Sequence, residues 1–372
     1  MVQEGTTSTV DFDLWNTNKC RVSGTGTLIW NVHYLREYIE GNWDGFTGQL
    51  IVNGTGKAGQ SQFAVRNGTG VKNARISLKG TAQVNGGKNA STYYLGGLSG
   101  DAGTKLSGFN VKAKGEGTWI VGTANTDEEF RGVIDNNDQA GTHPGTTSIE
   151  KQGSGDWRLT GNNVYSGTTV VTKGRLIVNG TNSGKGAVSV KNGATLAGEG
   201  TVAGKVTVSK GGTVHAGDST VNVKTLTLSG GLQVQQGGVV EFPLTTSGNF
   251  ARSNKLKVTG ALAINGGVLS LDISNAPQIA NDKSFALFDL SGATVSGTGF
   301  SSIEPARPSE TQVWDISELL TTGRIYVRAD ENSAVGTMTM PADDPAQAYS
   351  LGGVSGARRG IVVKQGKKFL TK

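Results

Sequence analysis

Apolar residues recur at alternate positions along the middle of the chain, and the recurrence has a nearly fixed step. One column of apolar positions begins at Val170 and continues with the pairs Val188 and Val190, Val206 and Val208, and Leu226 and Leu228. A second column runs through Val178, Leu196, Val214 and Val234, and it keeps the same distance behind the first at every step. Alternation predicts short β-strands, and a repeat of about 20 residues predicts a solenoid.

The spacing within one repeat favours a parallel β-helix over other solenoids. A leucine-rich repeat would need a helical segment and a fixed Asn position, and the columns contain neither. Extended chain rises about 3.3 Å per residue, so one repeat makes a coil about 60 Å around, enough for two or three strands and their corners. Glycines such as Gly193 and Gly211 fall between the columns, where turns or close backbone approach need them. We therefore expect an all-β chain in which each coil pairs with its neighbours.

Regularity decreases on both sides of these columns and divides the chain. Residues 48–135 contain comparable units without a clean period, and residues 314–327 predict a final pair of strands. Residues 329–346 are polar and rich in Ala and Asp, as in a linker. We predict an aromatic-rich N-terminal cap or first coils at 1–47, a parallel β-helix at 48–328, a polar linker at 329–346 and a C-terminal tail at 347–372.

The composition agrees with this architecture. The chain has 58 Gly but only 7 Pro among its 372 residues, and 35% of its residues are hydrophobic. So much glycine disfavours helix bundles and alternating helix and strand units. The sequence has no strict Gly-X-Y run, so it does not predict a collagen triple helix. Its evenly spread apolar residues argue against bulk disorder.

Positive charge is concentrated at one end of the chain. The net charge is +6, yet residues 356–372 contain six basic residues and no acid, so the remaining chain has 29 basic and 29 acidic residues. A nucleic-acid groove needs basic residues along one face together with stacking aromatics, so we expect no nucleic-acid partner. No run of 18 apolar residues is present, and no membrane-spanning helix is expected.

The single thiol and the first residues limit the choice of compartment. Cys20 excludes an internal disulfide framework and a cysteine-based zinc site, and we expect it to be buried beside Leu28 and Trp30. Residues 1–5 contain no basic segment followed by an apolar one. We expect a protein that is either cytosolic or has lost a leader, and the tail favours the second alternative.

Residues 147–217 carry a family resemblance. The segments are KQGSGDWRLTGNNVYSGTTVVTKGRLIVNG at 151–180, GATLAGEGTVAG at 193–204 and GGTVHAG at 211–217. They resemble the autotransporter-associated β-strand repeat. The resemblance implies a right-handed parallel β-helix in a secreted or surface-exposed protein of a Gram-negative bacterium.

Two further segments carry resemblances of their own. YSLGGV at 349–354 and RRGIVVKQGKKFLTK at 358–372 resemble the C-terminal secretion signals of Bacteroidetes, which a type IX or related export system reads. The alternation there also predicts a small β-hairpin. Residues 30–54 resemble segments found beside polysaccharide-lyase modules, which implies that the chain is the non-catalytic C-terminal part of a longer protein.

The densest acidic stretch is the main candidate for metal chemistry. A β-helical polysaccharide lyase would need several carboxylates on one face to hold calcium. Asp127 and Glu129 share one face of an extended strand and Asp135 follows, but no second pair is fixed nearby, so a solvated loop competes with a metal site. Three scattered His and no Gly-x-Ser-x-Gly motif argue against a hydrolase triad. We expect no catalytic residues and no cofactor, with calcium only if the chain is a lyase.

Aromatic residues are the best remaining candidates for a binding site. Those that crowd the N-terminal part include Trp15, Trp30, Tyr34, Tyr38 and Trp43. Sugars stack on flat exposed rings, so a row of them could bind polysaccharide. Large rings also cover the open end of an apolar column, so capping competes with glycan contact.

These features together predict a non-catalytic secreted or cell-surface β-helical stalk, an adhesin-like or accessory module. Its expected partners are polysaccharide or a host or cell-surface component, contacted through the long faces of the solenoid. Membrane association is expected only through export or anchoring of the tail. The alternatives are a polysaccharide lyase, or its C-terminal glycan-binding part, and a purely structural spacer.

Overall fold

The computed structural model describes residues 1–12, 17–33, 37–57, 61–87, 92–108, 115–136, 145–218, 223–248 and 250–331, and three short strands nearer the C-terminus. Within these residues every regular element longer than a turn is a β-strand. No helix among them could span a membrane. The chain forms two compact units, Met1–Ala329 and Asp330–Lys372.

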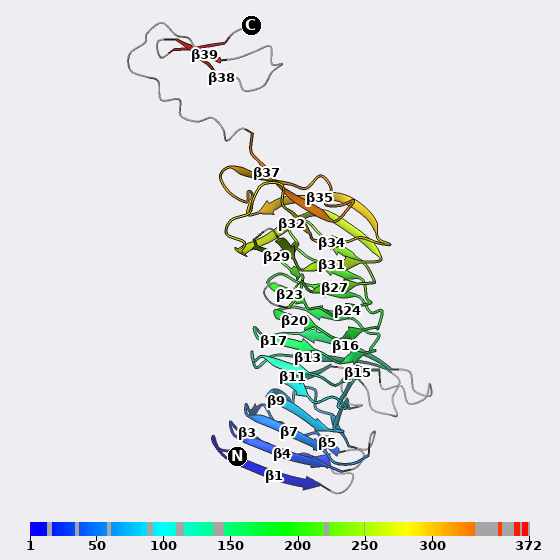
Figure 1. Cartoon of the computed structure of the whole chain (residues 1–372). Coiled ribbons are helices and arrows are strands. Elements are labelled where there is room, and N and C mark those ends of the chain that lie inside the picture. Colours follow the sequence, from blue (N-terminus) through cyan, green and yellow to red (C-terminus); the bar gives the residue numbers. More distant parts are fainter. Residues whose placement is uncertain are drawn as a thin grey trace. The chain divides into compact units, whose positions relative to one another are not determined.

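The first unit is a parallel β-helix, as the repeat predicted. One coil contains β22 (Val188–Val190), β23 (Ala194–Ala197) and β24 (Thr201–Val202). These strands pair in parallel with the corresponding strands one coil later, β25 (Val206–Val208), β26 (Thr213–His215) and β27 (Thr225–Leu228). Each coil therefore has three sides, and each side stacks on the same side of its neighbours (Figure 1).

One sheet of 20 strands supplies two of the three sides. Its first column includes β13 (Gly115–Val121), β16 (Gly145–Lys151), β19 (Thr169–Val171), β22, β25 and β28 (Leu232–Val234). Its second includes β1 (Thr7–Phe12), β4 (Thr27–Val32), β7 (Gln49–Gly54), β9 (Val71–Gly80), β14 (Glu128–Phe130), β17 (Asp156–Leu159), β20 (Gly174–Val178), β23, β26 and β29 (Val239–Ser247). Four long strands have residues in both columns: β9, β11 (Thr92–Gly100), β32 (Ala261–Asn275) and β35 (Thr294–Glu304).

The third side consists of two six-stranded sheets that follow one another along the chain. The earlier sheet contains β2 (Thr17–Asn18), β5 (Glu37–Ile39), β8 (Gln62–Val65), β10 (Gln83–Gly86), β12 (Lys105–Ser107) and β15 (Val133–Asp135). The later one contains β18 (Asn162–Asn163), β21 (Thr181–Asn182), β24, β27, β31 (Lys255–Val258) and β34 (Phe288–Asp289). A separate ladder joins β3 (Ser23–Gly24) and β6 (Gly45–Phe46).

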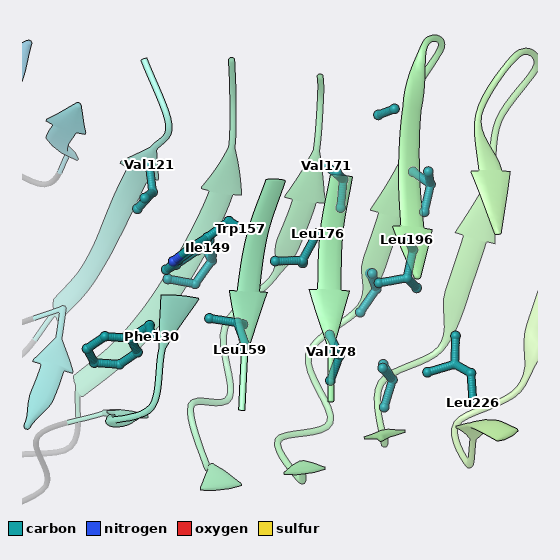
Figure 2. Close-up of a cluster of buried hydrophobic side chains, with 14 of the residues drawn as sticks. Val121, Phe130, Ile149, Trp157, Leu159, Val171, Leu176, Val178, Leu196 and Leu226 are labelled. Carbon is teal, nitrogen blue, oxygen red and sulfur yellow. The ribbon is translucent and has the colours of Figure 1, made fainter. Parts of the chain in front are cut away.

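Stacked apolar side chains fill the interior. Alternate residues of many strands point inward, as in β4 and β22, and they join one continuous cluster of buried residues that extends from Val2 to Val327. Figure 2 shows part of it, in which Leu176 and Leu196 come from successive coils, as do Trp157 and Leu176. Because every coil contributes at the same positions, burial of these side chains specifies the register of the stack.

The predicted columns are correct over part of their length and wrong at their ends. Val188 pairs with Val206, and Leu196 with Val214, as the spacing required. Val206 then pairs with Leu232, because the coil between them is longer than the coil before it. Leu226, predicted to continue that column, lies on the third side instead.

The prediction of the second column also fails at its first and last members. Leu176, not Val178, pairs with Leu196, and Val214 pairs with Val240. Val234 belongs to the first side, where it pairs with Val208. The long coil after Val206 shifts the partners of Val214 and Val234. Val178 fails for a different reason, because the coil from Leu176 to Leu196 is already longer than the coil from Leu196 to Val214.

Glycine permits the coils to approach at their corners. A Cβ atom on Gly186 would lie 1.8 Å from the carbonyl oxygen of Gly167, and one on Gly204 would lie 1.8 Å from that of Gly186. No side chain fits at such distances, so these glycines stack in register because the backbones touch. The structure thus favours close approach as the reason for glycine at these two positions.

The β-helix ends in a small antiparallel sheet of β33 (Ser284–Ala286), β36 (Gln312–Asp315) and β37 (Arg324–Ala329). This arrangement confirms the final strand pair predicted at 314–327. In the second unit, β38 (Tyr349–Leu351), β39 (Ile361–Lys364) and β40 (Lys367–Leu370) form an antiparallel sheet, and β39 and β40 form the predicted hairpin.

Candidate functional site

The N-terminal aromatic residues lie inside the first coils. The solvent-exposed fractions of Trp30, Tyr38 and Trp43 are only 2%, 7% and 1%. The rings of Trp30 and Trp43 stack with centroids 6.2 Å apart. The guanidinium of Arg66 lies 3.4 Å from the ring centroid of Tyr38, a cation–π contact that covers one face of that ring. These three rings are therefore part of the interior of the first coils, whereas sugar stacking needs an exposed face.

Trp15 and Tyr34, the other two predicted glycan contacts, lie outside the described residues. Their contact with polysaccharide stays a prediction. The expectation for Cys20 is wrong, because its side chain is exposed and not buried beside Leu28 and Trp30. Cys20 lies in the chain that leads from β2 to β3 at the outermost coil, where a residue has a covering coil on one side only.

A hollow of about 230 Å³ opens at the outermost coil. It is lined mainly by apolar residues of the first two coils, namely Met1, Val2, Val10, Arg21, Val22, Leu28, Trp30 and Trp43. The large rings thus come from the second coil, whereas the first coil contributes smaller side chains such as Val2, Val10 and Val22. Among the described residues these rings pack one level below the end, where the hollow opens.

The predicted acidic candidates do not converge on one point. Asp127 and Glu129 line the same shallow hollow, but the Asp127 carboxylate accepts a hydrogen bond from the backbone N–H of Asp156 at 2.8 Å, and Glu129 pairs with Arg131 at 3.1 Å. Asp135 lies on the third side, where its carboxylate pairs with Lys105 at 2.9 Å. Among the described residues no group of three or more His, Cys, Asp and Glu is arranged to hold a metal ion.

Two shallow hollows adjoin on one long face of the β-helix. One, of about 270 Å³, is lined by Thr47, Asn73, Arg75, Ala124 and Thr126. The other, of about 220 Å³, is lined by Asp127, Glu128, Glu129, Asp156 and Arg158. They meet between Thr126 and Asp127, which are consecutive in the chain. Together they offer hydrogen-bond donors and acceptors along one surface.

A charged ladder continues from this face along the next coils. Arg175 pairs with Asp156 at 3.2 Å, one coil apart, and its Nη2 donates to the backbone oxygen of Asp218 at 2.6 Å. The Asp218 carboxylate accepts from Arg158 at 2.6 Å and from Asn179 at 3.0 Å. This cluster was not predicted from the sequence. Asp156 and Arg175 stand about one repeat apart and pair in register, and that spacing could have indicated their contact.

Lys151 is a buried cation with backbone partners. Its side chain is almost fully buried, and Nζ donates to the carbonyl oxygens of Gln152, Gly153 and Lys173 at 2.6, 2.9 and 3.2 Å. Burial lowers the pKa of the Lys151 ammonium from 10.5 to about 8, against the opposing effect of Asp156 and Asp127. The ammonium joins the corners of two successive coils and is shielded from solvent, so its role is structural.

These features define the class of the protein: a parallel β-helix whose long faces carry polar ladders. The passenger-associated-transport-repeat family model matches residues 149–178, within the coils that contain Lys151 and Trp157. The match supports an autotransporter passenger-like repeat in this part of the chain. No curated protein matches the sequence.

Proposed function

We propose that the chain is a non-catalytic stalk exposed on the outer surface of a Gram-negative bacterium or secreted from it, and that it contacts polysaccharide or a host-surface component. The parallel β-helix and the passenger-type repeat at 149–178 fit an autotransporter passenger stalk. A stack held by neighbouring coils forms a long rigid element, which suits such a role.

The single observation that carries the contact part of this proposal is the pair of adjoining hollows at Thr126 and Asp127. Asn73, Arg75 and Arg158 supply donors there, and Asp127 and Asp156 supply acceptors. A polyhydroxylated ligand needs both kinds of group along an extended surface. The buried rings of Trp30 and Trp43 do not favour the N-terminal end for this task.

Binding and turnover on acidic and neutral polysaccharides test this proposal. The full chain should be retained on an immobilised polysaccharide, and Arg75→Ala combined with Asn73→Ala should reduce retention. Lys257→Ala, in an ion pair of the third side, serves as the matched control. Retention unaffected by the double variant would contradict this site, and failure to bind any polysaccharide or host-surface extract would favour a spacer. A calcium-dependent unsaturated product would favour the lyase alternative.

Export through the C-terminal tail belongs to the same proposal. The tail sequence at 349–372 carries the resemblance to a secretion signal, and its described strands form a small antiparallel sheet. The resemblance of the tail and the passenger-type repeat together support an extracellular location.

A further inference from the structure

The N-terminal end of the β-helix presents a regular strand edge. β1 pairs with β4 through six consecutive residue pairs, from Thr7 with Thr27 to Phe12 with Val32, without a register shift. Among the described strands, β4 is the one whose residues pair in register with β1. The strand contains no Pro and no bulge, which commonly prevent edge pairing, and its one charged residue is Asp11 near its end.

The register determines which backbone groups this edge exposes. The N–H of Thr27 donates to the carbonyl oxygen of Thr6 at 2.9 Å. In a parallel ladder the N–H and C=O of one residue point to the same neighbour, and successive residues alternate between the two edges. Ser8 and Val10 therefore direct their backbone groups toward β4. Thr7, Thr9 and Asp11 direct theirs away from it, to the outer edge.

The opposite end of the β-helix has an edge of a different kind. The ladder between β32 and β35 contains three register shifts. Gly297 and Gly299 of β35 have φ values of 100° and 83°, in the left-handed region, and Pro305 follows the strand. Such an edge resists addition of a regular strand. Stacking of one copy's N-terminal end on another copy's C-terminal end is therefore disfavoured.

We propose that the N-terminal end binds the N-terminal end of a second copy of this chain, through antiparallel pairing of the two β1 strands about a two-fold axis at Thr9. In this register Thr9 pairs with Thr9 of the second copy, and Thr7 with Asp11, so all three outward residues find partners. No two like charges are paired. The two apolar hollows of about 230 Å³ face each other and lose contact with water.

The inference follows from symmetry as well as from the free edge. A two-fold contact uses the same surface on both copies and closes after two, whereas a head-to-tail contact would continue into a filament. The regular edge at one end and the bulged edge at the other permit the first arrangement and oppose the second. The proposal is independent of the polysaccharide contact, because the two surfaces share no residue.

Sedimentation or light scattering of the full chain over a wide range of concentration tests the proposal. We expect a species of twice the 38.5 kDa chain mass. Thr9→Pro removes the outward N–H of each copy and leaves the ladder to β4 intact, so it should weaken association by about tenfold or more. Thr9→Val keeps the N–H and should associate like the parent. A monomer at all concentrations, or equal association of the Pro and Val variants, would overturn the proposal.

A cross-linking measurement keeps the proposal testable if Thr9→Pro does not fold. In a Cys20→Ser background, Thr9→Cys should give an intermolecular product with a short bis-maleimide. Thr294→Cys, at the start of β35, should not. A product from Thr294→Cys alone would indicate contact between two C-terminal ends, and a product formed only when the two Cys variants are mixed would indicate head-to-tail stacking. Either result in place of a product at residue 9 would contradict the two-fold arrangement.

Discussion

Arg158 donates a hydrogen bond from Nη1 to Oδ2 of Asp218 at 2.6 Å, although the two residues are far apart in the chain. Asp218 follows β26, and Arg158 belongs to β17, which lies in the same column earlier in the stack. The contact spans the coils between them, and Asn179 from one of these also donates to Oδ2. The corner that carries Asp218 is thus fastened to the outside of earlier coils.

Removal of this carboxylate should loosen the stack. We expect Asp218→Ala to lower the free energy of unfolding by about 1–2 kcal/mol, because two charged guanidinium groups and one amide lose acceptors or their alignment. Asp101→Ala is the matched control, since its ion pair with Lys79 is about half exposed. The control should change stability by less than about 1 kcal/mol. Denaturant unfolding measures both, and equal effects would contradict a special role for Asp218.

Close approach at the glycine corners leads to a second prediction. Gly186→Ala would place a Cβ 1.8 Å from the Gly167 oxygen, so the coils must separate locally, and we expect a loss of about 2–4 kcal/mol. Gly193 has φ +72° with nothing near its Cβ position. Gly193→Ala should therefore lose only about 1–2 kcal/mol through backbone strain. The ranking of the two melting temperatures checks the argument, and the reverse order would disprove it.

The fold could be predicted because a parallel β-helix repeats its packing requirement in every coil. Val188 and Val206 pair as the sequence period required. The period failed where the coil from Val206 to Leu232 lengthens, because a longer corner leaves the strand pairing intact while it shifts every later position. Periodicity therefore predicts the kind of fold. Which residues pair between coils also depends on the lengths of the corners.

Surface features were less predictable than the core. Asp218 contacts Arg158 only because the intervening corners have particular lengths, and no local pattern encodes that distance. The burial of Trp30 and Trp43 depends on a first coil that covers them, which composition alone does not reveal. A cluster of aromatic residues near a solenoid end can therefore be assigned to the cap or to the interior only when the number of coils outside it is known.

The C-terminal tail offers a prediction about export. Deletion of residues 349–372 should leave the β-helix folded, because the first compact unit ends at Ala329. If the tail is the export signal, the shortened protein should stay inside the cell. Protease treatment of intact cells, followed by immunoblotting, measures the exposed fraction. A variant in which Lys364, Lys367 and Lys368 become Ser separates the role of charge from that of the strands. Unchanged surface exposure after the deletion would show that the tail is not the export signal.

Lys151 predicts an unusual dependence of stability on pH. Burial lowers the pKa of its ammonium to about 8 in the folded chain, against 10.5 when unfolded. Below pH 8 both states are protonated, and the folded state bears the cost of burying the charge. Between about pH 8 and 10.5 the unfolded state binds more protons, so the free energy of unfolding from this group rises with pH, by a few kcal/mol at most.

A comparison of the parent chain with Lys151→Met isolates this effect. As pH rises from 8 to 10.5, the unfolding free energy of the parent should increase relative to that of the variant. The difference at pH 7 does not test this effect, because the variant also leaves three carbonyl oxygens without their donor. Lys173→Met, at an exposed position one coil later, should show no such shift. Denaturant titrations at several pH values measure the difference. A difference that is flat with pH would mean that the Lys151 ammonium is stabilised by its three carbonyls as well as by water.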